Sequence, residues 1–154
     1  MSKLTIRKGT VEDCISLAPR LRAEDVLELV LTMEGSLEEI LTGSLAESYE
    51  CYVGEAGGVV IAMGGIVLTD SPVGIPWLVG SPEVVQYPVA LVRYGRSSVD
   101  RWLQVRPVLE NFTWARNTVH HEWLRHIGFT LDPLQVPCGP HQEPFIHFSR
   151  KLNV

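Results

Sequence analysis

The 154-residue chain is poor in the features that mark secreted and membrane proteins. It has three cysteines, Cys14, Cys51 and Cys138, and this odd number at wide spacing predicts neither a disulfide framework nor a CxxC pair. The longest apolar stretch, residues 59–68, is far shorter than the roughly 20 residues of a membrane helix. The amino terminus lacks the apolar core of a signal peptide. We therefore expect a soluble, cytoplasmic protein with no membrane partner.

Basic side chains and the common nucleotide-binding motifs are scarce as well. Thirteen lysines and arginines against eighteen aspartates and glutamates give a net charge of −5. Nucleic-acid phosphates require a basic face, so we expect no nucleic acid partner. A Walker A loop, a GxGxxG loop and a GxSxG nucleophile elbow are all absent from the sequence. These absences do not support a P-loop protein, a dinucleotide-binding domain or a hydrolase with that elbow, although a local anion site stays open.

The residues that are present predict one α+β domain over residues 1–154. Apolar residues make up 45% of the chain and charged residues 20%, which are typical values for a globular domain. The pairs Thr10–Asp13 and Ser36–Glu39 have the form of capping boxes and mark two helix starts. Pro19 should interrupt the first of these helices, because proline removes a backbone donor and clashes with the preceding turn.

Glycines and prolines predict further boundaries. Gly57–Gly58 predicts a tight hairpin, and Gly64–Gly65 predicts a bulge or a close backbone approach. Ser81–Pro82 and Pro88 mark helix starts, and the proline-containing segment 132–144 is expected to be a loop. Strands are expected at residues 4–7, 50–55, 59–68, 75–79, 108–115 and 145–148, and helices at 24–33, 37–45, from 88 to just before Pro107, and at 119–127.

Five histidines raise the question of a metal site. His120, His121 and His126 fall on one predicted helix, and His141 and His147 lie in the tail. A zinc pair on a helix requires histidines four residues apart, as in HExxH, and this helix has no such pair. The spacing therefore favours packed or solvated histidines, and we expect no metal ligands.

A helix late in the chain carries a resemblance to a known superfamily. Asn117 follows a predicted strand and opens a helix that ends in Ile127–Phe129, with Gly128 at the position of a C-terminal cap. This segment resembles the late motif of the GNAT N-acetyltransferases, which ends in leucine-glycine-phenylalanine. Residues 4–13 resemble the common GNAT start, and the Gly57–Gly58 hairpin falls where that fold places its second and third strands. The resemblance implies a GNAT-like acyl-CoA N-acyltransferase fold, with a mixed central sheet flanked by helices.

A closer resemblance is to a small phage family related to the internal virion protein A of T7-like phages. It is carried by residues 77–81, by an arginine-containing helix that reaches Trp102, and by residues 114–120 and 123–128. The resemblance implies a phage-type protein located in the host cell cytoplasm or the virion. Virion or host proteins would then be its alternative partners.

The GNAT resemblance also implies a cofactor site. Acetyl-CoA or another acyl-CoA would bind where the fourth strand ends, at Val79, Gly80 and Ser81. GNAT enzymes place an Arg/Gln-x-x-Gly-x-Gly/Ala loop there, whose N–H groups bind the pyrophosphate of coenzyme A. In this sequence Pro82 removes one donor and Glu83 adds a negative charge.

Candidate catalytic and binding groups follow from the same comparison. The tyrosine that often protonates the leaving thiolate is replaced by Leu124, and His120, one turn earlier, is the predicted substitute because imidazole exchanges protons near neutral pH. Asn117 either binds a pantetheine amide or caps the helix. Asp70 and Glu83 are alternative candidates for a general base that accepts the amine proton.

Two hypotheses from different classes follow. The first is an N-acyltransferase that moves an acyl group, such as acetyl, from acyl-CoA to an amine acceptor, with a thioester carbonyl polarised by backbone N–H groups. The second is a non-catalytic GNAT-like scaffold with a role in virion assembly or host interaction, motivated by the altered loop and by Leu124.

Overall fold

The sheet of this protein is mixed and has seven strands within the described residues. The computed structural model describes residues 3–152, and the strand order is β1-β2-β3-β4-β5-β7-β6. This arrangement confirms the predicted α+β class with a mixed central sheet. The strands are β1 (Leu4–Lys8), β2 (Glu50–Ala56), β3 (Val59–Leu68), β4 (Val73–Gly80), β5 (Val108–Trp114), β6 (Thr130–Cys138) and β7 (Glu143–Lys151).

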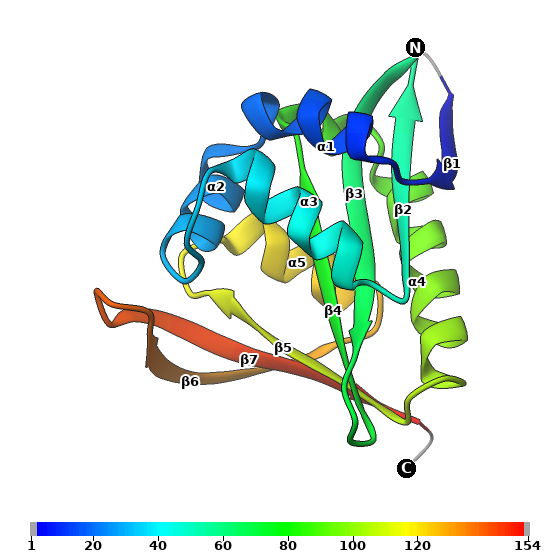
Figure 1. Cartoon of the computed structure of the whole chain (residues 1–154). Helices are drawn as coiled ribbons and strands as arrows, with labels where there is room; N and C mark the ends of the chain where they lie inside the picture. The colour runs from blue at the N-terminus through cyan, green and yellow to red at the C-terminus, as the bar shows by residue number, and fades with distance from the viewer. Residues whose placement is uncertain (1–2, 153–154) are drawn as a thin grey trace.

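Helices cover both faces of the sheet. One face carries α1 (Val11–Leu17), α2 (Ala23–Val30) and α3 (Leu37–Glu47), and the other carries α4 (Pro88–Leu103) and α5 (Thr118–His126), as Figure 1 shows. Two short 3₁₀ helices, η1 (Ala18–Arg20) and η2 (Pro82–Gln86), join these elements to their neighbours. Over residues 3–152, no helix is both long enough and apolar enough to cross a membrane.

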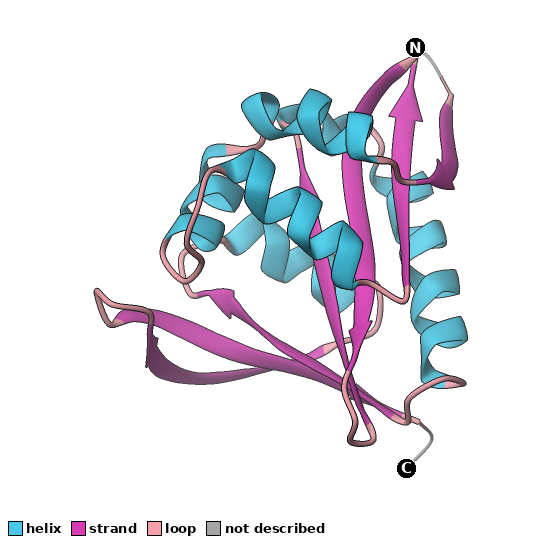
Figure 2. Ribbon diagram, in the orientation of Figure 1, coloured by secondary structure: helices cyan, strands magenta, loops and turns pink. Residues whose placement is uncertain are grey.

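The pairing between β4 and β5 is short. These two strands are parallel and pair only through Val73–Gly74 and Val108–Leu109, whereas the other neighbouring strands are antiparallel. Beyond Gly74, β4 continues to Gly80 without a ladder on its β5 side. The two strands therefore diverge toward their carboxyl ends, and Figure 2 shows the sheet opening between them.

Several local predictions are confirmed. Both capping boxes form: the hydroxyls of Thr10 and Ser36 accept backbone N–H groups, and Asp13 and Glu39 bond back to the caps. The helix α1 ends just before Pro19 and gives way to η1. These patterns are reliable because donor and acceptor lie within four residues of each other.

The glycine predictions are resolved by the structure as well. Gly57 and Gly58 turn the β2–β3 hairpin with φ values of 59° and 77°, a region that strongly favours glycine. Gly64 marks a close approach and not a bulge, because a Cβ there would lie 2.8 Å from Cδ1 of Leu78. The register shift of this hairpin lies elsewhere, between Gly54 and Glu55.

One boundary prediction is wrong. Segment 132–144 is largely strand and not loop, because β6 runs through Pro133 and Pro137 to Cys138 and pairs with β7. Its outer side has no strand neighbour among the described residues, so the missing proline N–H groups cost the ladder little. The helix starts predicted at Ser81 and Asn117 are both present, but the first leads only to the short η2, and neither Ser81 nor Asn117 makes a side-chain cap hydrogen bond.

Candidate functional site

A cavity occupies the opening between β4 and β5. Its volume is about 380 Å³, and both helical layers line it. Glu28 and Leu29 of α2 contribute from one face of the sheet, and Tyr94 of α4 with His120 and Leu124 of α5 contribute from the other. The cavity therefore passes through the plane of the sheet, where β4 and β5 lack a ladder beyond Gly74.

The backbone of β4 presents polar groups to this opening. The N–H of Gly80 donates to Oδ2 of Asp25 at 2.9 Å and so points away from β3. Backbone groups alternate in direction along a strand, so the N–H and C=O of Leu78 face the same side as those of Gly80. The C=O of Pro76, two residues earlier, accepts from Nδ2 of Asn111 at 2.9 Å. Within the described residues, the backbone N–H and C=O of Leu78 therefore have no partner strand on the cavity side of β4.

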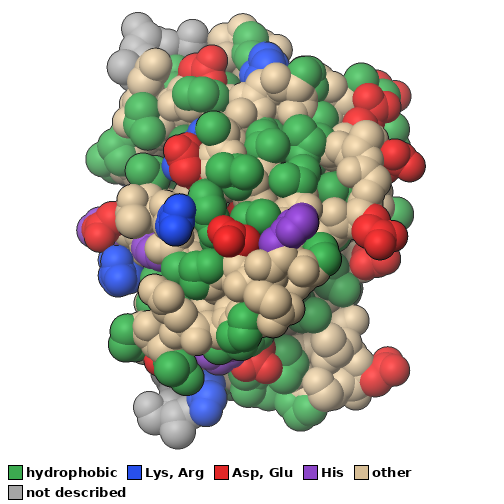
Figure 3. Space-filling model, turned by 90° about the vertical axis from the view of Figure 1, so that its left-hand side faces the viewer, with side chains coloured by type: hydrophobic (Ala, Val, Ile, Leu, Met, Phe, Trp, Pro, Cys, Tyr) green, Lys and Arg blue, Asp and Glu red, His purple; other side chains and the backbone are tan. Residues whose placement is uncertain are grey.

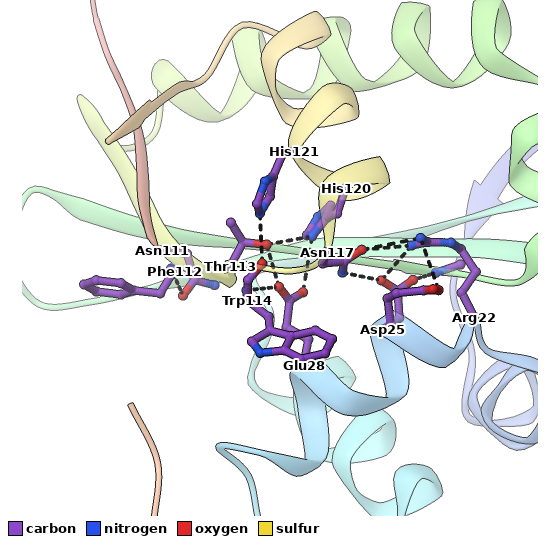
Figure 4. Close-up of polar contacts among 12 residues, drawn as sticks. Arg22, Asp25, Glu28, Asn111, Phe112, Thr113, Trp114, Asn117, His120 and His121 are labelled. Carbon is purple, nitrogen blue, oxygen red and sulfur yellow. Dashed lines mark hydrogen bonds and ion pairs between the residues drawn. The ribbon is translucent and has the colours of Figure 1, made fainter. Parts of the chain in front are cut away.

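A buried ion pair joins α2 to the ends of β4 and β5. Oδ1 of Asp25 accepts from Nη1 of Arg22 and from Nδ2 of Asn117, each at 3.0 Å (Figure 4). The backbone N–H of Arg22 donates to the C=O of Gly80 at 2.9 Å, and its guanidinium also reaches Oδ1 of Asn117 at 3.4 Å. These bonds hold the first residues of α2, the end of β4 and the start of α5 together.

A second acid of α2 binds β5. Oε1 of Glu28 accepts from the N–H of Trp114 and from the hydroxyl of Thr113, each at 2.5 Å. Oε2 of the same carboxylate lies 3.2 Å from Nδ1 of His120, and Oγ1 of Thr113 lies 3.1 Å from that nitrogen (Figure 4). Because Nδ1 faces a carboxylate, it carries a proton. The other ring nitrogen, Nε2, is buried and has no hydrogen-bond partner among the described residues.

Burial and charge act in opposite directions on this pair. Burial alone would lower the pKa of His120, but the charge of Glu28 and the hydrogen bond to it outweigh burial, so the pKa lies above its usual value. Burial would raise the pKa of Glu28, and His120 lowers it below its usual value. Both groups are therefore stabilised in their charged forms. The neighbouring His121 behaves differently, because its burial lowers its pKa and its Nε2 bonds the C=O of Trp114.

The predicted cofactor residues lie at the end of β4, as expected from the sequence. Val79 is buried and lines the cavity, but the ladder alternation turns its backbone toward β3. The N–H groups of Gly80 and Ser81 already have acceptors in Asp25 and in the C=O of Ile61. The turn at Gly80 and Ser81 therefore has no free N–H group at these two residues to offer a ligand. Side chains and the shape of the cavity define the candidate site at this end of β4.

The other predicted residues divide between the cavity and the surface. His120 and Leu124 line the cavity from α5. Asp70 lies in the turn between β3 and β4, at the opposite end of β4 from Gly80, so it is not beside the cavity. Glu83 is exposed on η2 and does not line the cavity either.

The structure tests how well coenzyme A would fit these residues. The opening between β4 and β5, with the unpaired Leu78 backbone and the unpartnered Nε2 of His120, fits the thioester end of an acyl-CoA. The turn after β4 fits a pyrophosphate poorly. Ser81 and Val84 donate their N–H groups within the chain, and Pro82 has none. Among residues 81–84, only the N–H of Glu83 is left to bind a phosphate, and the side chain of Glu83 is negatively charged. These residues therefore do not form a phosphate-binding loop of backbone N–H groups.

Three possible metal-ligating side chains converge beside the cavity. Asp25, Glu28 and His120 each place one ligand atom within 4.8 Å of the others. The Asp25 oxygens already accept N–H groups, including that of the Arg22 guanidinium, and the Glu28 oxygens bond β5 and His120. These bonds account for the cluster as a hydrogen-bonded network, and a cation would have to displace a positive charge to enter it.

The two acids of α2, Asp25 and Glu28, are not among the site residues predicted from the sequence. Asp25 and Glu28 lie three residues apart and share one face of the helix, which is the signal that could have found them. That face is turned inward, whereas Leu27 and Val30 are 42% and 44% exposed. On the side of the molecule that carries α2, hydrophobic side chains are visible at the surface between acidic ones (Figure 3). The helix therefore directs two acids inward beside Val26 and Leu29, which pack against the apolar core, and leaves two apolar side chains exposed.

Comparison with known proteins identifies the fold. No protein-family model and no curated protein sequence matches the chain. A GNAT-family acetyltransferase from Bacillus anthracis is 11% identical with a TM-score of 0.72, over 98% of this chain and 96% of that one. An N-acetyltransferase from Staphylococcus aureus Mu50 is 14% identical with a TM-score of 0.72, over 99% and 100%. A GNAT superfamily phosphinothricin acetyltransferase from Sinorhizobium meliloti, in complex with acetyl-CoA, is 18% identical with a TM-score of 0.68, over 99% and 90%.

The chain therefore has the GNAT acyl-CoA N-acyltransferase fold, and the fold prediction is confirmed. At these identities, the likeness concerns the path of the backbone.

Proposed function

We propose that the protein is an acyl-CoA-dependent N-acyltransferase in which His120 is the general acid. The observation that carries this proposal is the position of His120: it lines the cavity between the diverging strands β4 and β5, and its Nε2 has no other partner among the described residues. The phosphinothricin acetyltransferase of the same fold, solved in complex with acetyl-CoA, supports acyl-CoA as the donor. Acetyl-CoA is the simplest member of that class, and the acceptor is an amine.

The protein would bind the donor at the open end of the sheet. Val79 lines the cavity, Gly80 and Ser81 follow it at the end of β4, and Asn117 holds the adjoining start of α5. The Leu78 N–H is available to polarise a thioester carbonyl. Because the turn after β4 provides few N–H donors for a pyrophosphate, binding energy would come mainly from the pantetheine and acyl portions.

His120 accounts for both proton transfers of the reaction. The acyl donor supplies an electrophilic thioester carbon and a thiolate leaving group. As the C–N bond forms and the C–S bond breaks, the imidazolium gives its Nε2 proton to the sulfur. The neutral imidazole then takes the proton that the former amine nitrogen must lose. One amide and one thiol result, and His120 returns to its charged form, which its raised pKa favours.

Calorimetry and a thiol-release assay test this proposal. Titration with acetyl-CoA should show binding with a dissociation constant at or below the order of 1 mM. Turnover with a panel of amino acids, polyamines and peptides should release free thiol. His120→Asn should bind acetyl-CoA normally and lose about 10²-fold or more in rate. His126→Asn, an exposed histidine on the same helix, is the matched control. Absence of binding at millimolar acetyl-CoA would refute the proposal.

The second candidate is a non-catalytic phage scaffold. It is favoured by the turn after β4, in which Asp25 already binds the Gly80 N–H and Glu83 opposes an anionic ligand. The sequence resemblance to the internal virion protein family is what supports a phage setting, with virion or host proteins as partners. Copurification of the protein with virions, together with no heat on titration with acetyl-CoA, would favour this candidate over the enzyme.

A further inference from the structure

We propose that Glu28 is a positioning residue, which fixes the ring of His120 through Nδ1 and thereby leaves Nε2 as the proton donor of this cavity-lining histidine. The catalytic part of this inference rests on the proposed function, whereas the orienting part concerns the protein alone. It assigns to α2, which directs Asp25 and Glu28 inward, a role in completing the site that β5 and α5 begin.

Contacts with β5 fix the carboxylate of Glu28 independently of His120. Oε1 receives two hydrogen bonds from β5, from the N–H of Trp114 and the hydroxyl of Thr113. With that oxygen fixed, Oε2 has one direction left, and it faces Nδ1 of His120 at 3.2 Å. The β5 backbone thus orients the carboxylate, and the carboxylate orients the ring. Outer groups of this kind set the tautomer and direction of a working histidine.

The contact with Glu28 determines which tautomer the neutral ring of His120 adopts. Because Nδ1 donates to Glu28, the neutral ring that remains after proton loss carries its hydrogen on Nδ1 and a lone pair on Nε2. That lone pair faces no protein donor among the described residues, since Nε2 is buried without a partner. The ring can therefore release and recover a proton only through Nε2, the nitrogen that has no partner among the described residues.

Other charged groups near His120 do not replace Glu28 in this role. Asp25 on α2 also favours the imidazolium, but the Arg22 guanidinium that it binds disfavours it. His121, the neighbour on α5, bonds the C=O of Trp114, and Thr113 on β5 is uncharged. Glu28 is the one carboxylate of the described residues within ion-pair distance of the ring.

A single substitution separates positioning from packing. In Glu28→Gln, the amide oxygen can still accept from Trp114 and Thr113, so the link between α2 and β5 is kept. The amide nitrogen replaces Oε2 and donates to Nδ1, where the carboxylate accepted. The proton of the neutral ring then moves to Nε2. Glu122→Gln, on the solvent side of α5 beside Arg125, is the matched control.

NMR of the intact protein with ¹⁵N-labelled histidine measures this directly. In the wild type, neutral His120 should carry its proton on Nδ1. In Glu28→Gln it should carry the proton on Nε2 and titrate at lower pH, and Glu122→Gln should match the wild type. An Nε2–H tautomer in the wild type, or an unchanged titration in Glu28→Gln, would overturn the inference. The wild-type measurement decides the tautomer even where the variant fails to fold.

The thiol-release assay tests the catalytic part with acetyl-CoA as the donor. Glu28→Gln should lower kcat by about 10²-fold, leave the KM for acetyl-CoA unchanged, and move the alkaline limb of the pH–rate profile to lower pH. A raised KM with unchanged kcat would contradict a positioning role. If the wild type neither binds nor turns over acetyl-CoA, the proposed function fails, while the tautomer measurement still decides whether Glu28 orients the ring.

Discussion

The two ends of the β4–β5 pair are held together by different forces. At the closed end, Val73–Gly74 pair with Val108–Leu109 through the backbone, and Leu109 packs with Ile66 and Phe148 in a buried apolar cluster. At the open end the backbone ladder is missing, and side chains of α2 bind the two strands instead. Asp25 binds the Gly80 N–H and Glu28 binds the Trp114 N–H.

The difference shows how a sheet can open while the last backbone donor of each strand, at Gly80 and at Trp114, stays paired. A strand that loses its neighbour exposes N–H groups that are costly to bury. Here two carboxylates accept those N–H groups, and Arg22 and His120 balance their charge. The open end therefore depends on a few charged contacts, whereas the closed end depends on many apolar ones. Substitutions at the two ends should accordingly differ in size and in pH dependence.

The largest effect is expected from Asp25→Ala at the open end. This change leaves the Gly80 N–H and the Asn117 amide without their acceptor and removes the buried carboxylate that pairs with Arg22, so that only the exposed Glu24 stays near the guanidinium. Removing one partner of a buried ion pair costs about 3–5 kcal/mol of unfolding free energy. Urea denaturation followed by circular dichroism measures it. Glu24→Ala, which removes an exposed carboxylate 3.6 Å from the same arginine, is the control and should cost far less.

A slightly smaller effect is expected from Leu109→Ala at the closed end. Leu109 is fully buried, and its removal leaves a cavity, so the variant should lose about 2–5 kcal/mol in the same denaturation experiment. The loss should be equal at pH 6.5 and pH 8.5, because no titratable partner is removed. Leu134→Ala, at an exposed position of β6, should be nearly neutral. A strong pH dependence of the Leu109→Ala loss would contradict the contrast between the two ends.

A pH-dependent contribution is expected from His120. Its pKa in the native state lies above the value of 6.5 that an unperturbed histidine has. The native protein therefore keeps a proton that the unfolded chain has lost, and its unfolding free energy falls as the pH rises from 6.5 through the native pKa. His120→Asn lacks this contribution, so the stability difference between wild type and variant should shrink from pH 6.5 to about 8.5.

Two other groups limit the window of that experiment. His121 has a lowered pKa and acts below pH 6.5, and burial raises the pKa of Cys51 to about 12, so its thiol matters only at more alkaline pH. Paired urea titrations at the two pH values isolate His120 between these limits. A difference that grows with pH would show that the assigned direction of the pKa is wrong.

The smallest effect is expected from Glu122→Ala. Glu122 pairs with Arg125 at 3.2 Å on the exposed side of α5. An exposed ion pair of this kind contributes about 0.5 kcal/mol or less, and salt screens it. Thermal unfolding should therefore give a melting temperature close to that of the wild type. Together with Asp25→Ala, this variant separates the value of a buried charge contact from that of a surface one.

Local patterns in the sequence predicted elements well, and distant contacts account for the failures. The capping boxes at Thr10 and Ser36 form because all their atoms come from one turn. Asn117 follows a strand and opens a helix as predicted, yet its side chain bonds Asp25, 92 positions earlier in the chain, and leaves the helix uncapped. No pattern around Asn117 contains that partner, so the prediction of a cap could not succeed.

The same limit applies to the candidate site. His120 was identifiable because it lies one turn before Leu124, which replaces the tyrosine of the family pattern, whereas Glu28 belongs to a helix without a recognised motif. An acid on a helix is usually solvated, so the inward direction of Glu28 is visible only once β5 is placed beside α2. Leu27 and Val30 are exposed on that helix, while Asp25 and Glu28 face inward.

The proline content of β6 bears on how this protein meets other copies of itself. An outermost strand normally offers a row of free N–H groups to which another chain can add a strand, the first step of many aggregates. Along β6, Pro133 and Pro137 delete two donors, and the register shift between Leu131 and Gln135 interrupts the row. Growth of the sheet by edge-to-edge addition is thus obstructed on this side, and the sheet stops at β6.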